Sequence, residues 1–187
     1  SSQYPFFVLG ANFGPYHTEE YRSAMDKVYT KLKDICFRDT YSKNLFADND
    51  HVRQAPDILF SYPMPKVEEN KKQIFISVIS YYKDKELNSD FDQMTDEEYI
   101  EKIAQITSGF TKEGYQVILA SFCREEGDLD AAREIKNKSE QQKNITIIDY
   151  DGTNRNQLLE EMSRSIYIIA ARFHGTILGL TAGKSVF

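Results

Sequence analysis

Two arginines and one histidine are the residues of this chain best suited to hold and transform a small anion. Arg172 and His174 follow an apolar run at residues 166–171, and Arg38 follows a shorter run at residues 34–37. Arginine binds phosphate and carboxylate groups through paired N–H donors that stay charged. Histidine, with an ordinary pKa of about 6.5, exchanges a proton near neutral pH. Together these residue types predict a site for a dianionic or trianionic ligand.

The positions of these residues strengthen this prediction. The apolar runs are typical of buried strands, and ligands of open α/β sheets bind at the carboxyl ends of the strands. A helix pattern of small and apolar residues begins directly after Arg172, and a helix N-terminus favours anions. The polar residues expected at strand ends are Asn12, Arg38, Asp39, Ser80, Tyr81, Ser121, Glu125, Glu126, Asp128, Asp149, Asp151, Arg172 and His174.

Each candidate also has a purely structural interpretation. Asp39 fits the cap of a short helix at residues 40–46, with Arg38 solvated or paired to it, and the residues alone favour this interpretation. His174 could be a helix-start residue satisfied by backbone groups. The two glycines around Asn12 fit either a tight strand-to-helix turn or a backbone that approaches a ligand closely.

Composition narrows the class of protein. The 187 residues are 41% hydrophobic and 28% charged, which is typical of a globular protein. The net charge of −6 argues against non-specific nucleic-acid binding, which needs a basic face. No apolar run approaches the roughly 20 residues of a membrane helix. The first residues lack a basic segment followed by an apolar core, so we expect no signal peptide.

The cysteines and histidines predict neither a disulfide framework nor a metal site. Cys36 and Cys123 both lie in apolar, strand-like runs and match no metal motif, which indicates a reducing compartment and a cytoplasmic location. His17, His51 and His174 lack the spacing of metal ligands, so we expect no protein-bound metal.

Strand and helix patterns alternate along the chain with short connections, which predicts an α/β protein with parallel sheets. A polar connection with prolines at residues 61–73 separates two parts, for which we place domains at 1–66 and 67–187. Thr95 and Glu98 fit a capping box. The expected strands are 6–9, 34–37, 74–80, 115–121, 145–149 and 166–171, with another beginning at 185, and the expected helices are 18–32, 40–46, 95–113, 129–138, one around 158 that Asn154 or Asn156 caps, and one after 172.

Five stretches, taken in order and spacing, resemble the polysaccharide pyruvyl transferase family. They include the Arg-Asp pair at Arg38 and Asp39 and the Arg-Phe-His-Gly segment that begins at Arg172. The matching stretches are residues 9–15, 37–42, 55–57, 121–128 and 171–175 with the apolar helix that follows.

The resemblance implies Rossmann-like halves of a glycosyltransferase-B-like architecture, incomplete at both ends in this chain, which as a fragment could be inactive. It implies transfer of the enolpyruvyl group of phosphoenolpyruvate onto a sugar of a surface polysaccharide or its precursor, with formation of a ketal. By the same resemblance, Arg38 and Arg172 hold the phosphate and carboxylate of the donor, His174 transfers the proton, Asp39 belongs to the substrate-binding Arg-Asp motif, and Asn12 shapes the acceptor side.

The resemblance implies no cofactor besides the donor substrate, and its partners are a small-molecule donor and a glycan acceptor. A lipid-linked acceptor would bring the protein to a membrane surface without a transmembrane segment. The acidic turn at residues 125–128 could bind sugar hydroxyls, although capping of its own helix is favoured. Two other functions stay open: a nucleotide-sugar transferase of similar architecture, and a non-catalytic glycan-binding relative.

Overall fold

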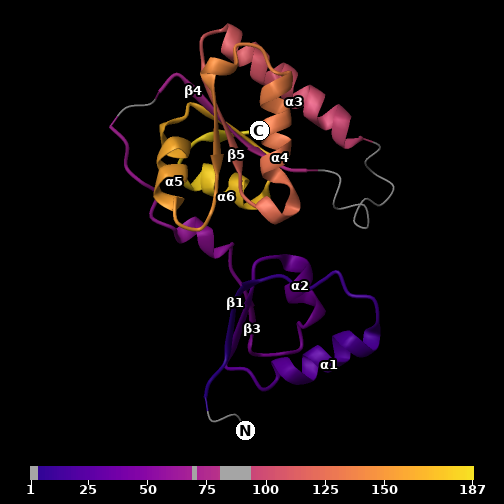
Figure 1. Cartoon of the computed structure of the whole chain (residues 1–187). Helices are drawn as coiled ribbons and strands as arrows, with labels where there is room; N and C mark the ends of the chain where they lie inside the picture. Colours follow the sequence, from indigo (N-terminus) through magenta and orange to yellow (C-terminus); the bar gives the residue numbers. More distant parts are fainter. Residues whose placement is uncertain (1–3, 69–70, 81–93) are drawn as a thin grey trace. The chain divides into compact units, whose positions relative to one another are not determined.

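The computed structural model describes residues 4–68, 71–80 and 94–187, which form two compact units, Ser1–Tyr62 and Pro63–Phe187 (Figure 1). The division falls within the polar connection at residues 61–73. Each unit has its own sheet, and every strand pair in both sheets is parallel. The expectation of an α/β protein with Rossmann-like parallel sheets is therefore confirmed.

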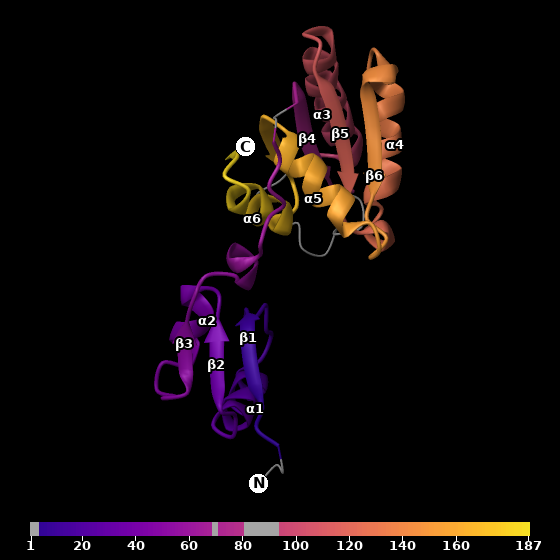
Figure 2. The same ribbon diagram turned by 90° about the vertical axis from the view of Figure 1, so that its left-hand side faces the viewer.

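The first unit is a three-stranded sheet in the order β1-β2-β3, whose strands lie side by side in Figure 2. Short helices connect the strands, and the 3-10 helix η1 follows the last of them. The elements are β1 (Phe7–Ala11), α1 (Glu19–Tyr29), β2 (Asp34–Phe37), α2 (Thr40–Leu45), β3 (Val52–Gln54) and η1 (Ile58–Ser61).

An aromatic cluster fills one face of this sheet. Phe37 of β2 packs with Tyr29 of α1 and with Phe46, which follows α2, and the ring centroids lie 4.9–5.8 Å apart. Phe13 joins the same cluster from the turn after β1. These large side chains supply most of the apolar burial that a sheet of this size can obtain.

The strand expected at residues 6–9 forms, but the burial that such an apolar run predicts is not found. Phe7 is 62% exposed and Leu9 is 58% exposed, because β1 is an edge strand and these two side chains point away from the aromatic cluster. Val8, between them, packs against that cluster. On the second face of this sheet, Cys36 of β2 is buried, whereas Phe7 and Leu9 at the edge are exposed.

The second unit is a five-stranded sheet in the order β6-β5-β4-β7-β8. Its elements are β4 (Gln73–Val78), α3 (Asp96–Lys112), β5 (Gln116–Ser121), η3 (Arg124–Glu126), α4 (Asp128–Lys138), η4 (Gln142–Asn144), β6 (Ile145–Asp149), α5 (Arg155–Arg164), β7 (Tyr167–Ala170), α6 (Phe173–Thr181) and β8 (Ser185–Val186).

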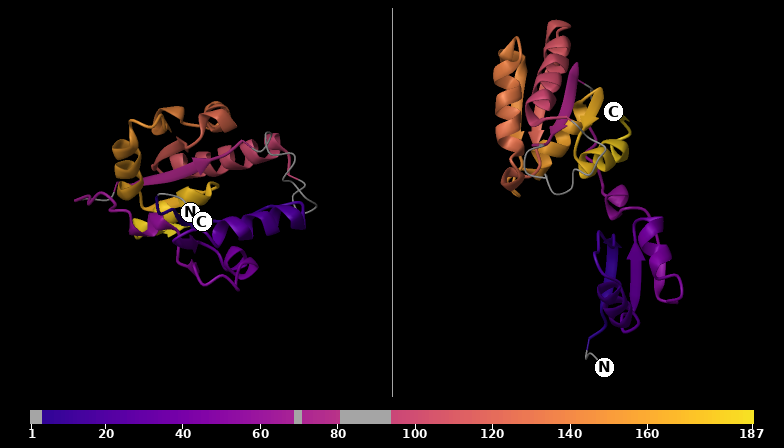
Figure 3. Two further views of the ribbon diagram at one scale, coloured as in Figure 1. Left: turned by 90° about the horizontal axis from the view of Figure 1, so that it is seen from below. Right: turned by 90° about the vertical axis from the view of Figure 1, so that its right-hand side faces the viewer.

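Helices cover both faces of this second sheet. Ile74 and Ile76 of β4 pack against residues of α3 and α4, and α6 lies against Ile168 on the other face. Figure 2 shows α5 in front of the strands, and the right-hand view of Figure 3, from the opposite side, shows α3 and α4 in front of them. A continuous apolar run is the pattern expected of a strand that is buried on both faces, and every residue of β4 is buried.

Local signals fixed most helix ends as expected. Thr95 and Glu98 form the predicted capping box at the start of α3, and Gly114 ends that helix with a φ of +82°. Thr18 caps α1, which ends at Tyr29 rather than near residue 32. The prediction that Cys123 lies in a strand-like run is wrong, because β5 ends at Ser121.

Candidate functional site

The carboxyl edge of the five-stranded sheet gathers several of the predicted polar residues. The parallel register pairs Ser121 of β5 with Asp149 of β6 and pairs Ser77 of β4 with Ala170 of β7. Ser121 Oγ donates a hydrogen bond of 2.8 Å to Asp149 Oδ1. Arg172 follows β7 at the same edge, so these side chains share the location where parallel sheets bind ligands.

Arg172 is a fixed cation at this edge. Its Nε donates to Asp128 Oδ2 at 3.0 Å, its Nη2 donates to Asp128 Oδ1, and its Nη1 donates to Glu126. The backbone N–H of Arg172 donates to Ser77 Oγ at 3.3 Å. Burial lowers the pKa of the guanidinium, but the bonds to Asp128 and Glu126 outweigh this effect and raise it. Arg172 therefore keeps its charge, and its position is set by groups from β4 and from the segment after β5.

Asp128 is the buried partner that holds Arg172. Besides the two bonds from Arg172, its Oδ2 accepts hydrogen bonds from the backbone N–H groups of Phe122 at 3.2 Å and Cys123 at 3.0 Å. The expectation that the acidic turn caps its own helix is wrong. Gly127 stands at the cap position of α4 without a side-chain bond, and Asp128 turns back toward the loop after β5.

A close approach between α6 and β4 seats the Arg-x-His segment. A Cβ atom on Gly175 would lie 2.6 Å from Ser77 Oγ and 3.1 Å from Ser77 Cβ. Real Cβ atoms do not approach so closely, so only glycine lets the start of α6 rest directly on Ser77. Because Ser77 also accepts the Arg172 N–H, the same serine fixes the strand exit and the first turn of the helix.

His174 lies in the first turn of α6 with its side chain exposed. Its ring packs edge-on against Phe173, with 5.4 Å between the ring centroids. Within the described part of the chain no hydrogen bond joins the imidazole to another group. The described residues therefore do not support the interpretation in which backbone groups bond the His174 ring. The exposed imidazole is accessible to a ligand.

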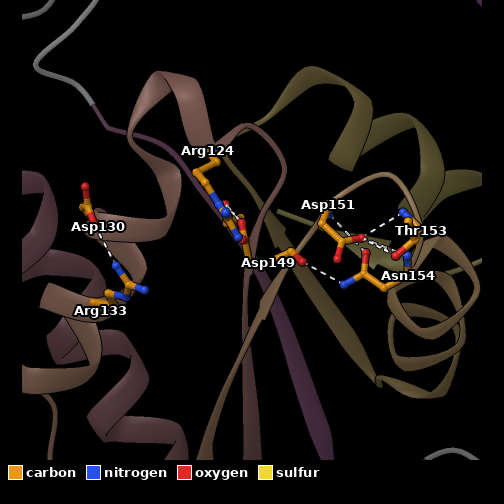
Figure 4. Close-up of polar contacts among 8 residues, drawn as sticks. Arg124, Asp130, Arg133, Asp149, Asp151, Thr153 and Asn154 are labelled. Atoms are coloured by element: carbon orange, nitrogen blue, oxygen red, sulfur yellow. Dashed lines mark hydrogen bonds and ion pairs between the residues drawn. The ribbon is translucent and has the colours of Figure 1, made fainter.

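The two carboxylates at and just after the end of β6, Asp149 and Asp151, both accept bonds from neighbouring groups (Figure 4). Arg124 Nε donates to Asp149 Oδ2 at 2.8 Å. Asp151 Oδ1 accepts from the Thr153 backbone and hydroxyl at 2.8 and 2.7 Å and from the Asn154 N–H at 3.2 Å, and these bonds lower the pKa of Asp151. Asn154 occupies the cap position of α5, but its side chain donates to the Asp149 carbonyl instead of capping the helix.

Arg38 forms a comparable corner in the first unit. Its backbone N–H continues the ladder to Ala11, and its Nη1 donates to Asp57 at 2.8 Å. Its Nη2 donates to Asn12 Oδ1 at 3.0 Å. The structure therefore brings the predicted residues Asn12 and Arg38 together. The ion pair of Arg38 is with Asp57, which lies 19 residues further along the chain.

Asp39 caps α2, as its structural interpretation predicted. Its Oδ1 accepts from the Ser42 backbone and its Oδ2 accepts from the Ser42 hydroxyl, both at 2.7 Å. Ser42 Oγ in turn accepts from the Phe13 N–H at 2.7 Å. Asp39 thus ties the start of α2 to the turn after β1, next to Asn12 and Arg38, while its role in substrate binding stays a prediction.

Sequence reasoning missed the role of two residues that anchor these corners. Asp57 lies in one of the stretches that resemble the family, without an assigned role, and Asp128 belongs to the acidic turn that was expected to cap a helix. A signal existed for Asp57, because it follows Pro56 directly and its side chain bonds the Leu59 N–H at the start of η1. Of the remaining expected residues, Tyr81 lies outside the described residues.

The described residues offer neither a cluster of metal ligands nor a helix that could span a membrane. Across residues 4–68, 71–80 and 94–187, no group of three or more histidine, cysteine, aspartate or glutamate residues is arranged to hold a metal ion. In the same ranges, no helix combines the length and the apolar character that crossing a membrane requires.

The fold and the polar edge define a class: an α/β chain of parallel sheets with an Arg-x-His turn at the carboxyl end of a strand. A family model described as polysaccharide pyruvyl transferase matches residues 1–187, and the chain belongs to this family. The resemblance found from the sequence is thereby confirmed. A comparison with curated proteins found no match.

Proposed function

We propose that this protein transfers the enolpyruvyl group of phosphoenolpyruvate to a sugar of a surface polysaccharide or of its precursor. The family supports pyruvyl transfer to a polysaccharide in general. The observation that carries the proposal for this chain is the turn at Arg172 and His174, where a fixed cation and an exposed imidazole stand two residues apart. The first can bind an anionic donor and the second can move a proton.

Each residue then has a role in the reaction. The imidazolium of His174 protonates the methylene carbon of the donor, which becomes a methyl group and leaves a cationic carbon beside it. A sugar hydroxyl bonds to that carbon and returns its proton to the imidazole. A second hydroxyl of the same sugar then replaces the phosphate, and its proton leaves with inorganic phosphate. Arg172 binds the anionic part of the donor and stabilises the charge that grows on the leaving phosphate.

The corner in the first unit supplies the other proposed contacts. Arg38 is held by Asp57 and Asn12, so its guanidinium is oriented before any ligand arrives. We assign Arg38 to the anionic donor and Asn12 to the side of the acceptor. Asp39, whose two oxygens both bond Ser42, contributes by fixing the backbone of this corner.

The donor is the part of this proposal that is tested most simply. The thermal midpoint of the protein is measured with phosphoenolpyruvate, with a panel of nucleotide-sugars, and without ligand. A ligand that binds only the folded state raises the midpoint, and at about 100 times its Kd it stabilises by about 2.7 kcal/mol. We expect stabilisation by phosphoenolpyruvate that Arg172→Ala removes. Stabilisation by a nucleotide-sugar and none by phosphoenolpyruvate would favour a nucleotide-sugar transferase instead.

A further inference from the structure

The two carboxylates that bind Arg172 differ sharply in how they are held. The Asp128 side chain is fully buried and accepts two backbone hydrogen bonds in addition to those from Arg172. The Glu126 side chain is 52% exposed and reaches Arg172 from η3, a helix of three residues. Separating the buried pair would leave an uncompensated buried charge, whereas an ion pair with an exposed partner contributes little. Glu126 is therefore the partner that can leave.

The guanidinium of Arg172 has N–H donors that its two carboxylates do not use. It carries five N–H donors, of which three bond Asp128 and Glu126. The other two have no partner among the described residues. An anion that takes the place of Glu126 would gain Nη1 while Asp128 continues to hold Nε and Nη2.

The charges at this corner favour such an exchange when an anionic donor binds. Arg172 contributes one positive charge, and Asp128 with Glu126 contribute two negative charges, so the cluster has a net charge of −1. The Cys123 thiol beside it reports the same negative field. A hydrogen bond from the Glu126 backbone lowers the pKa of this thiol, but burial and the Glu126 and Glu125 carboxylates raise it above its ordinary value.

We propose that Glu126 is an exchangeable ligand of Arg172, which the anionic group of phosphoenolpyruvate displaces, so that Glu126 sets the affinity for the donor. This inference rests on the proposed function, because it takes the donor from it. Glu126 occupies Arg172 Nη1 when the donor is absent and swings toward solvent when the donor binds. The charge of Glu126 therefore opposes donor binding, and its removal strengthens binding.

The test is a calorimetric titration of phosphoenolpyruvate into the protein and into two matched variants. Glu126→Gln keeps the size of the side chain and removes its charge. Asp130→Asn is the control, because Asp130 is an exposed carboxylate on α4 that pairs with Arg133 instead (Figure 4). We expect Glu126→Gln to lower the Kd about five- to tenfold, which is the effect of one unit charge about 4 Å from the ligand near water. Asp130→Asn leaves the Kd unchanged.

Two results would count against the inference, and they differ. If all three proteins bind phosphoenolpyruvate and Glu126→Gln binds it equally or more weakly, the exchange is wrong while the proposed donor stands. If none of the three binds phosphoenolpyruvate, although each unfolds at the same denaturant concentration, the proposed function fails and the exchange fails with it. If Glu126→Gln binds phosphoenolpyruvate more tightly and Asp130→Asn does not, the result supports both the exchange and the proposed donor.

Discussion

Each of the two arginine corners of this protein joins a guanidinium to a buried aspartate and to a second acceptor, and the two second acceptors differ in charge. Arg38 follows β2 and Arg172 lies just beyond β7, and each guanidinium binds a buried aspartate from its own unit, Asp57 and Asp128. The second partner of Arg38 is the neutral amide oxygen of Asn12. The second partner of Arg172 is a carboxylate, that of Glu126.

This difference changes the net charge that an anionic ligand meets at each arginine. At Arg38 the charges of the guanidinium and Asp57 balance, and the second acceptor is the neutral amide oxygen of Asn12. At Arg172 the second carboxylate leaves an excess negative charge, and a ligand must displace it. An arginine after a strand is therefore not a ready anion site by residue type alone, because its partners decide what a ligand meets.

The largest expected effect distinguishes the two buried aspartates. Asp128→Ala removes the buried partner of Arg172, which keeps only the exposed Glu126, and leaves two backbone N–H groups without their acceptor, so we expect a loss of about 3–5 kcal/mol in the free energy of unfolding. Asp57 accepts a bond from Arg38 and one from a backbone N–H, so Asp57→Ala removes fewer bonds, and we expect a loss of about 1.5–3 kcal/mol. Urea unfolding of both variants measures the difference. Equal losses would show that the two corners are held alike.

A smaller effect is expected where α6 rests on β4. Gly175→Ala forces its Cβ against Ser77, and such overpacking costs about 1–3 kcal/mol of stability. Gly109 of α3 is the matched control, because nothing lies within 4 Å of the position of its added Cβ. Gly109→Ala should stabilise the protein by about 0.5–1 kcal/mol. Denaturant unfolding measures the change in the free energy of unfolding for each variant. The two changes have opposite signs if α6 rests as closely on Ser77 as the structure shows.

Exchanging the second partner of Arg38 sharpens the comparison further. Asn12→Asp places a carboxylate where the amide stands, so the first corner acquires the excess charge of the second. We expect this variant to raise the Kd for phosphoenolpyruvate about fivefold, the opposite of Glu126→Gln. Tighter binding by Asn12→Asp, measured by calorimetry, would contradict the assignment of Arg38 to the donor.

The smallest expected effect is on the reactivity of Cys123. Its thiol pKa is raised, in part by the Glu126 and Glu125 carboxylates, and only the thiolate reacts with alkylating agents. Glu126→Gln removes a charge that disfavours the thiolate, so the midpoint of the alkylation rate against pH should fall by less than about one pH unit. Mass spectrometry follows Cys123 separately, with the buried Cys36 as an internal reference. An unchanged midpoint would show that Glu126 does not act on this corner.

The sequence predicted the elements better than it predicted their partners. The capping box at Thr95 and the helix end at Gly114 depend on residues close together in the chain, and both were found as expected. The contacts of Arg38 with Asp57 and of Arg172 with Asp128 join residues 19 and 44 positions apart, and no local pattern specifies such pairs.

The burial of β1 could not be predicted for a related reason. Phe7 and Leu9 belong to an apolar run as continuous as that of β4, but a run of apolar residues does not specify which neighbours cover each face. In the second unit helices cover both faces of the sheet, and in the first unit the described residues cover one face well.

The most direct test of the central claim is the release of phosphate from phosphoenolpyruvate in the presence of candidate glycan acceptors, with the product analysed for a pyruvate ketal. We expect the protein to release phosphate only when an acceptor is pyruvylated, and His174→Ala to lower kcat by about 10²–10⁴-fold, the usual contribution of a general acid. His51→Ala, which changes an exposed histidine of the first unit, should keep the activity of the unaltered protein. Ketal formation that continues undiminished in His174→Ala would contradict the account.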